Sequence, residues 1–191
     1  MHARRISEVL DYWFYPERHH HHGKPRPMWF SGGTPVDTEI RQLFGGDIER
    51  AIDGRYDGWA ATPRGALALL LLLDQFTRNA FRGTARAFAG DHRALAIARK
   101  AVARGFDRRF NEHARIFFYL PFEHSESLGD QHVCIGLIAR FRPPRSLRWA
   151  VQHRNIVARF GRFPHRNAVL ARPSTAAEEA YLASPHERFG Q

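Results

Sequence analysis

Apolar residues recur along this chain with the spacing of helices, and almost no stretch alternates apolar and polar residues as a half-buried strand does. Apolar positions three and four apart predict a first helix over residues 4–14, which Pro16 ends. The longest apolar run, residues 66–73, lies in a central helix that Thr62 and Pro63 should start. The pattern predicts an all-α fold.

A loop over residues 16–36 separates the first helix from the second, because histidines, glycines and prolines there disfavour regular structure. We expect Trp29 and Phe30 to anchor this loop to the core. Asp37 is a natural N-cap for the second helix, although the glycines at 45 and 46 weaken its interior.

The second half of the chain contains further capping signals and helix breakers. Asp91 should cap a helix that Gly105 closes, and Asn111 should cap the next helix. Pro121 should kink or break that helix just before its acidic end. The other expected features are the stop of the central helix at Gly83, helices over 130–141 and 146–160 separated by Pro143 and Pro144, and a capping box of Thr175 and Glu178.

Successive antiparallel helical hairpins of this kind pack as a bundle or a short superhelix. The chain has 191 residues, of which 43% are hydrophobic, so it can bury one sizeable core. We therefore expect a single helical domain over residues 1–191, with its core at about 4–182.

The formal net charge of +10 is carried almost entirely by arginine, since Lys24 and Lys100 are the only lysines. Arginine pairs with carboxylates and phosphates, so the excess fits internal pairing or anion recognition, and compositional bias accounts for it equally well. Nucleic-acid binding is disfavoured, because the arginines are spread along the chain and form no basic stripe.

Cys134 is the only cysteine and lies in an apolar stretch, which excludes a disulfide framework and a thiolate metal cluster. The N-terminal segment lacks the features of a signal peptide, and the longest apolar run is too short to cross a bilayer. These observations predict a soluble, cytoplasmic protein.

The first candidate site is a group of charges and amides that ends the leucine-rich helix: Asp74, Arg78, Asn79 and Arg82. Arg78 and Arg82 lie one turn apart and could clamp a carboxylate or phosphate, while Asp74 orients Arg78. Alternatively, Asp74 and Arg78 pair within the helix as a structural pin, because buried polar groups normally find protein partners.

The second group, Glu123, His124 and Glu126, places an imidazole between two carboxylates. A carboxylate beside a histidine can make it a general acid or base. A divalent metal is not expected, because the spacing of metal-ligating pairs is absent. Otherwise Glu123 neutralises an arginine of the core.

The third group follows a helix that ends at Gly161 and comprises Arg162, His165, Arg166 and Asn167 on a non-helical segment. Polar residues on a loop held by a rigid scaffold often build sites. In the alternative interpretation Arg166 and Asn167 satisfy helix-end carbonyls and His165 packs against Phe163.

The three groups together predict a polar pocket that binds a small anionic ligand and acts on it if the protein is an enzyme. His124 or His165 would then carry a proton, Glu123 would orient it, and Arg78, Arg82 and Arg166 would clamp the anion. No cofactor is expected. The alternative function is a peptide- or protein-binding module without catalysis, with an exposed groove lined by Trp13, Trp29, Trp59 or Trp149.

Three segments resemble the hallmarks of an uncharacterised, mainly bacterial family, domain of unknown function 924. They are LDQFTRNAFRGTARAFAGD (73–91), FFYLPFEHSESLGDQ (117–131) and HRNIVARFGRFPHRN (153–167). The resemblance implies a tetratricopeptide-like, all-helical fold over about residues 9–182 and no known biochemical role. The family usually has proline where Thr77 stands, and threonine restores a backbone N–H, so we expect a straighter helix here.

Overall fold

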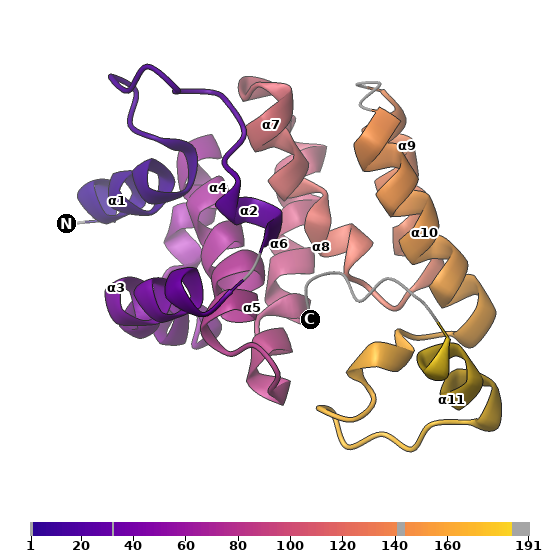
Figure 1. The fold of residues 1–191 in the computed structure, drawn as a ribbon. Coiled ribbons are helices and arrows are strands. Elements are labelled where there is room, and N and C mark those ends of the chain that lie inside the picture. Colours follow the sequence, from indigo (N-terminus) through magenta and orange to yellow (C-terminus); the bar gives the residue numbers. More distant parts are fainter. Residues whose placement is uncertain (1, 32, 141–143, 185–191) are drawn as a thin grey trace.

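The structure is a computed structural model that describes residues 2–31, 33–140 and 144–184 (Figure 1). Within these ranges every regular element is helical, which confirms the all-α fold. No helix of the described chain is long and apolar enough to cross a membrane. The longer elements are α1 (His2–Phe14), α3 (Thr34–Ile52), α4 (Pro63–Leu70), α6 (Asp91–Ala103), α9 (Leu128–Ala139), α10 (Pro144–Phe160) and α11 (Ala176–Ala183).

Shorter elements connect these helices. Four are α-helical: α2 (Met28–Ser31), α5 (Thr77–Ala80), α7 (Glu112–Arg115) and α8 (Leu120–Glu123). One, η2 (Leu71–Phe76), is a π-helix between α4 and α5. The others are the 3₁₀ turns η1 (Asp57–Ala61), η3 (Ala85–Phe88), η4 (Asp107–Arg109), η5 (Ile116–Phe118) and η6 (Pro164–Arg166).

The central rod of α4, η2 and α5 organises the molecule. Helices α1, α3 and α6 pack around it, and α9 and α10 lie side by side at one edge (Figure 1). All eight residues from Ala66 to Leu73 are fully or almost fully buried, so the rod forms the middle of the main apolar cluster. A smaller cluster of Ile156, Val157 and Phe163 lies at the C-terminal end.

The rod is less regular than expected. Thr62 caps its start by accepting a hydrogen bond from Gly65 N (3.2 Å), as the sequence predicts. However, the helix becomes a π-helix at Leu71–Phe76, an irregularity just before Thr77 that the sequence does not predict. The Thr77 hydroxyl donates back to Leu73 O (2.8 Å), a bond that a proline could not make. The helix stops at Ala80, and Gly83 turns the chain with a φ of 75°.

Two predicted N-caps are wrong. Helix α3 is capped at Gly33, and α6 at Gly90, so Asp37 and Asp91 lie in the first turns of their helices. Both carboxylates bind arginines near the C-terminal end of the rod instead. Helix α3 also runs unbroken through Gly45 and Gly46, because tertiary packing outweighs the low helix propensity of glycine.

Other helix ends agree with the sequence. Asn111 caps α7 by accepting from Ala114 N (3.0 Å), and Thr175 forms the expected capping box with Glu178. The helix after Asn111 is broken, but earlier than predicted, because η5 follows α7 and α8 runs through Pro121 to Glu123. Phe141 and Pro143, expected at the α9–α10 boundary, lie outside the described residues.

The expected loop over 16–36 contains regular structure at its end, because α2 and the first turn of α3 fall within it. Trp29 anchors it as predicted. Its indole nitrogen donates to Trp13 O (2.7 Å), and its side chain belongs to the main apolar cluster. The Phe30 side chain lies outside the described part of the structure.

Candidate functional site

A group of buried charged and polar side chains joins the rod to α6, α8, α10 and η6. We call it the polar cluster. Its members come from segments far apart in the sequence, and most are less than 10% exposed. They are Asp74, Arg78, Asp91, Glu123, His124, His153 and Arg166.

Asp74 and Arg78 form the centre of the polar cluster. Arg78 Nη1 lies 3.0 Å from Asp74 Oδ1, and both residues are buried. Arg78 also donates to both carboxylate oxygens of Asp91, at 2.7 and 2.9 Å. One guanidinium therefore serves two carboxylates, and this bidentate geometry is the strongest available to an ion pair.

Gly90 sets the distance between α6 and the rod. A Cβ atom at Gly90 would lie 2.1 Å from Leu73 O, so only glycine permits this approach of the two backbones. Asp91 follows directly and is thereby brought within reach of Arg78. The π-helix at Leu71–Phe76 lies at the same place, and such turns often occur at functional sites.

His124 forms a dyad with Asp74. Its Nδ1 lies 2.7 Å from Asp74 Oδ1. Burial acts to raise the pKa of Asp74, but Arg78 and His124 hold this pKa below its ordinary value, so Asp74 is a carboxylate and only accepts. His124 Nδ1 therefore carries a proton and donates it. Burial, with the nearby Arg78, lowers the pKa of His124, which leaves a neutral ring with its lone pair on Nε2.

Glu123 and His153 form a second acid–imidazole pair beside this dyad. Glu123 Oε1 lies 3.2 Å from His153 Nδ1, and the His124 and His153 ring centroids are 6.2 Å apart. Burial and Asp74 raise the pKa of Glu123 to about 8, whereas burial and His124 lower the pKa of His153 to about 3. Both groups are therefore mostly neutral at pH 7.

Cys134 lies near Glu123, and burial raises the pKa of its thiol.

Arg166 completes the polar cluster from η6. Its guanidinium carbon lies 4.5 Å from the ring centroid of Phe163 and 4.7 Å from that of Phe88. The one carboxylate within ion-pair distance of its guanidinium is Asp91, at 3.5 Å, and the guanidinium donates no hydrogen bond to any described residue. Burial and the neighbouring Arg78 lower its pKa to about 10, so Arg166 remains a cation at neutral pH.

The structure separates some residues that the sequence grouped together. Asn79 and Arg82 both bind Asp37, at 2.8 and 2.7 Å, and so fasten α5 to α3 instead of facing Arg166. Glu123, expected to orient His124, contacts His153, and Asp74 has the orienting position.

The third group is also divided. Arg162 binds Glu178 (2.6 Å) on α11. The segment expected to be non-helical forms the 3₁₀ turn η6, and Arg166 projects from it into the polar cluster. His165 packs with Phe163, at 5.5 Å between ring centroids, as the structural alternative expected.

Glu126 and Asn167 belong to a network that fixes the segment carrying Arg166. Glu126 accepts from Phe163 N (2.8 Å) and receives two hydrogen bonds from Arg172. Arg172 also donates to Asn167 Oδ1 (3.1 Å). This network fastens η6 to the segment between α8 and α9 and therefore sets where Arg166 lies.

Sequence reasoning missed Asp91, His153 and the aromatic partner Phe88 as members or neighbours of the site. The sequence alone indicates only a helix cap at Asp91 and assigns no role to His153. A signal was nevertheless present, because the family-like segments end at Asp91 in one case and begin at His153 in another.

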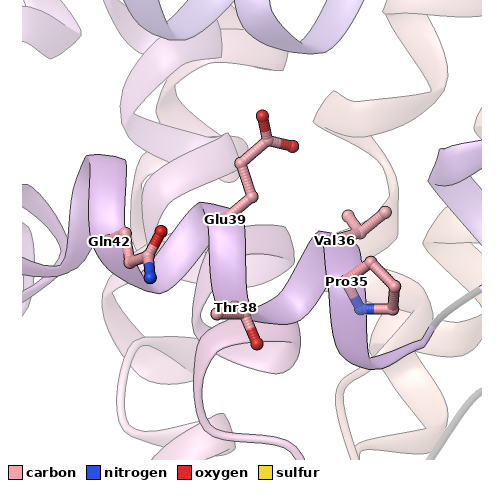
Figure 2. A pocket seen from close by; sticks show the side chains of 5 residues that line it. All are labelled: Pro35, Val36, Thr38, Glu39 and Gln42. Atoms are coloured by element: carbon pink, nitrogen blue, oxygen red, sulfur yellow. The ribbon is translucent and has the colours of Figure 1, made fainter.

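Two hollows in the described surface lie away from the polar cluster. One, of about 550 Å³, is lined by residues of α3 alone (Figure 2). In Figure 2 their side chains project in different directions and do not converge. The other, of about 730 Å³, runs beside α1. Trp29 is among the residues that line it, but Trp29, Trp13 and Trp59 are all buried, so none of the three presents an exposed aromatic surface. No set of three or more His, Cys, Asp or Glu side chains in the described ranges could hold a metal ion.

The Glu123→Gln substitution should reveal the raised pKa of Glu123 as a pH-dependent stability difference. Folded Glu123 keeps its proton to about pH 8, whereas its ordinary pKa is 4.5, so stability falls as pH rises through this window. Glutamine is neutral throughout. The free energy of unfolding of the variant relative to the parent should therefore rise by at least about 1 kcal/mol between pH 5 and 8.

Urea denaturation at several pH values measures this difference, with exposed Glu179→Gln as the matched control. Titrating groups that do not contact Glu123 are common to both proteins and cancel. A difference that stays constant with pH would mean that Glu123 is ionised in the folded protein.

A family model described as "Bacterial protein of unknown function (DUF924)" matches residues 9–186. Among solved structures, a protein of unknown function from Agrobacterium tumefaciens, ATU0120, has a similar fold, with a TM-score of 0.86 and 37% sequence identity. The match covers 96% of this chain and 99% of that chain. No curated protein matches the chain.

Proposed function

Since the chain belongs to the bacterial family of unknown function DUF924, a family whose name describes no activity, we propose a function from the geometry of the polar cluster. The polar cluster binds a small anion of carboxylate or phosphate type, and His124 exchanges a proton with that ligand or with a water beside it. Arg166 is the observation that carries this proposal.

Arg166 is a buried cation whose hydrogen-bonding capacity is unused within the described chain. It is 7% exposed, and its Nε is a buried donor without a partner. Buried donors are normally satisfied, and charged ones cost the most when they are not. Asp91 meets Arg166 only at 3.5 Å and already accepts two hydrogen bonds from Arg78. A ligand oxygen would give Arg166 the acceptor it lacks.

The Asp74–His124 dyad supports an acid–base role. Asp74 fixes the tautomer of His124, so Nε2 is the basic nitrogen, and the 16% exposed ring makes no other hydrogen bond to a described residue. A carboxylate behind an imidazole also stabilises the imidazolium that forms when Nε2 takes a proton. His124 is therefore the proton carrier that we favour over His165.

A cytoplasmic location forms part of the same proposal. The chain's only cysteine, Cys134, is buried as a free thiol, which is compatible with a reducing compartment.

Binding of inorganic phosphate and of small dicarboxylates tests the proposal directly. An anion that binds the folded state raises the melting temperature, with a gain of about 2.7 kcal/mol in stability at a concentration of 100 Kd. This gain should be present in the parent and in Arg108→Gln, which removes an exposed arginine outside the polar cluster. It should be absent in Arg166→Gln.

Arg166 is a better test than Arg78, because Arg78 also neutralises Asp74 and its loss would strongly destabilise the fold. The comparison of melting temperatures requires that Arg166→Gln is folded and melts cooperatively without ligand. Equal stabilisation of the parent and Arg166→Gln, or no stabilisation by any of these anions at millimolar concentration, would reduce the polar cluster to a structural network.

Nitrogen NMR of the imidazole rings tests the role of His124 separately. The free protein should show the proton of His124 on Nδ1, and addition of the anion should shift the Nε2 resonance. Exposed His132 is the internal control, since it lies on the solvent face of α9. An Nε2 resonance that does not respond to a bound anion would rule out the proton-transfer part of the proposal.

A further inference from the structure

The larger hollow runs beside α1 and is a second candidate site, which we call the α1 groove. Its volume is about 730 Å³, within the range typical of small-molecule pockets. Its walls come from α1, from the loop that arches from α1 toward α7, from the start of α4 and from the η4–α7 segment (Figure 1). No member of the polar cluster lines it, so the two sites are independent.

The lining of the α1 groove includes a continuous apolar row. Ile6, Leu10 and Phe14 are spaced four residues apart on α1 and extend over about 12 Å along the helix. Leu67 and Ala114 add apolar surface from α4 and α7. Such a row fits an unbranched apolar chain that lies parallel to α1.

Two cations in the lining of the α1 groove have no partner in the described chain. They are Lys24 and Arg109, both exposed lining residues whose side chains make no described ion pair or hydrogen bond. Asn111 Nδ2 donates to Gly23 O (3.3 Å), which brings the loop segment that carries Lys24 next to the segment that carries Arg109. The backbone segments that carry the two positive charges are therefore adjacent in the lining.

The other charged residues of the lining change this picture little. Arg64 and Glu17 pair with each other at 3.2 Å. Asp11 is an acid without a described partner, so the unpaired formal charge of the lining is two cations against one anion. His22 and His113 would add positive charge when protonated.

We propose that the α1 groove binds an amphipathic carboxylate, with its apolar chain along Ile6, Leu10 and Phe14 and its carboxylate on Lys24 and Arg109. The apolar row supplies most of the affinity through burial of the chain. The two cations make the groove prefer a ligand whose chain ends in a carboxylate. Exposed ion pairs contribute modestly to affinity, but they fix the orientation of the ligand.

Dodecanoate, titrated into ¹⁵N-labelled protein, is the probe. We expect shifts at Gly23, Asn111, Ala114 and the Trp29 indole, because all four line the groove. Acetate, which has the end group alone, should leave these signals unchanged. The double variant Lys24→Gln/Arg109→Gln should bind dodecanoate about fivefold more weakly, and should fold normally because both side chains are exposed.

Three controls test whether the apolar chain and the carboxylate bind where the proposal puts them. Arg108→Gln should keep the parent affinity for dodecanoate, and so should Arg166→Gln, which tests the polar cluster. Dodecyltrimethylammonium has the same chain and the opposite charge, and its binding should not weaken in the double variant. The proposal is overturned if dodecanoate shifts other surfaces, if the double variant keeps its affinity, or if a short apolar peptide shifts the groove signals and dodecanoate does not.

Discussion

Replacing Arg78 with methionine is expected to lower the free energy of unfolding by about 3 to 5 kcal/mol. Arg78 is the cation beside Asp74, a carboxylate that is 2% exposed, and it also binds both oxygens of Asp91. Its loss leaves Asp74 buried without a cation, and a buried unpaired charge is among the costliest defects in a protein. Methionine fills much of the vacated volume. The decrease in the free energy of unfolding therefore comes mainly from the lost charge and less from a cavity. Urea denaturation at pH 7 measures it.

The double variant Asp74→Leu/Arg78→Met separates charge from packing. Removing both partners of a buried ion pair costs far less than removing one, so the double variant should be more stable than Arg78→Met alone. Arg4→Met removes an exposed cation that pairs with Glu8 and should change stability by less than about 1 kcal/mol. A loss in Arg78→Met no larger than in Arg4→Met would contradict a buried ionised pair.

The Gly90→Ala variant is expected to lose about 3 kcal/mol of stability, an unusually large effect for the addition of one methyl group. The new Cβ would lie 2.1 Å from Leu73 O and 2.9 Å from Leu73 C, both of them backbone atoms. The backbone of the rod cannot move aside as a flexible side chain can, so α6 must shift. That shift would also pull Asp91 away from Arg78.

Gly136→Ala is the matched control for Gly90→Ala. Gly136 lies within α9, and a Cβ there would meet no atom within 4 Å. Alanine should therefore raise stability by about 0.5 to 1 kcal/mol through its higher helix propensity. Thermal and urea unfolding of both variants measure the contrast. A Gly90→Ala protein as stable as the parent would mean that α6 does not approach the rod as closely as the structure indicates.

Local features of the fold could be predicted from the sequence because they depend on a few neighbouring residues. The cap at Thr62, the cap at Asn111 and the capping box at Thr175 each involve atoms within three positions along the chain. The place of Pro121 in the first turn of α8 has the same local origin, since a proline there needs no backbone N–H. The all-α class follows from such features and from the spacing of apolar residues.

The π-helix and the two wrong caps could not be predicted in this way. Asp37 and Asp91 have the chemistry of caps, but each lies opposite an arginine that only the tertiary fold brings near. A bidentate pair with a guanidinium is a stronger interaction than one capping hydrogen bond. A glycine that precedes the aspartate in the chain takes the cap in both helices.

The members of the candidate site could be predicted from the sequence, but their contacts could not. Asp74, Arg78, Glu123, His124 and Arg166 were identified by residue type and position, and all five lie in the polar cluster. Their pairing was not predictable, because neighbours on one helix point in different directions. Glu123 and His124 are adjacent in sequence yet bind His153 and Asp74 respectively.

The contact between Asp91 and Arg166 has a consequence for how the chain matures. It joins η6 to the first turn of α6, far away along the chain, and Arg166 comes from the segment that contributes Phe163 to the smaller apolar cluster. Such long-range contacts form late, since the intervening loop must close first. A chain synthesised only as far as α6 contains Arg78 and Asp91, whereas Arg166 can join the polar cluster only after η6 has been made and has docked. Binding of an anion by Arg166 would therefore be a property of complete chains and not of chains still being synthesised.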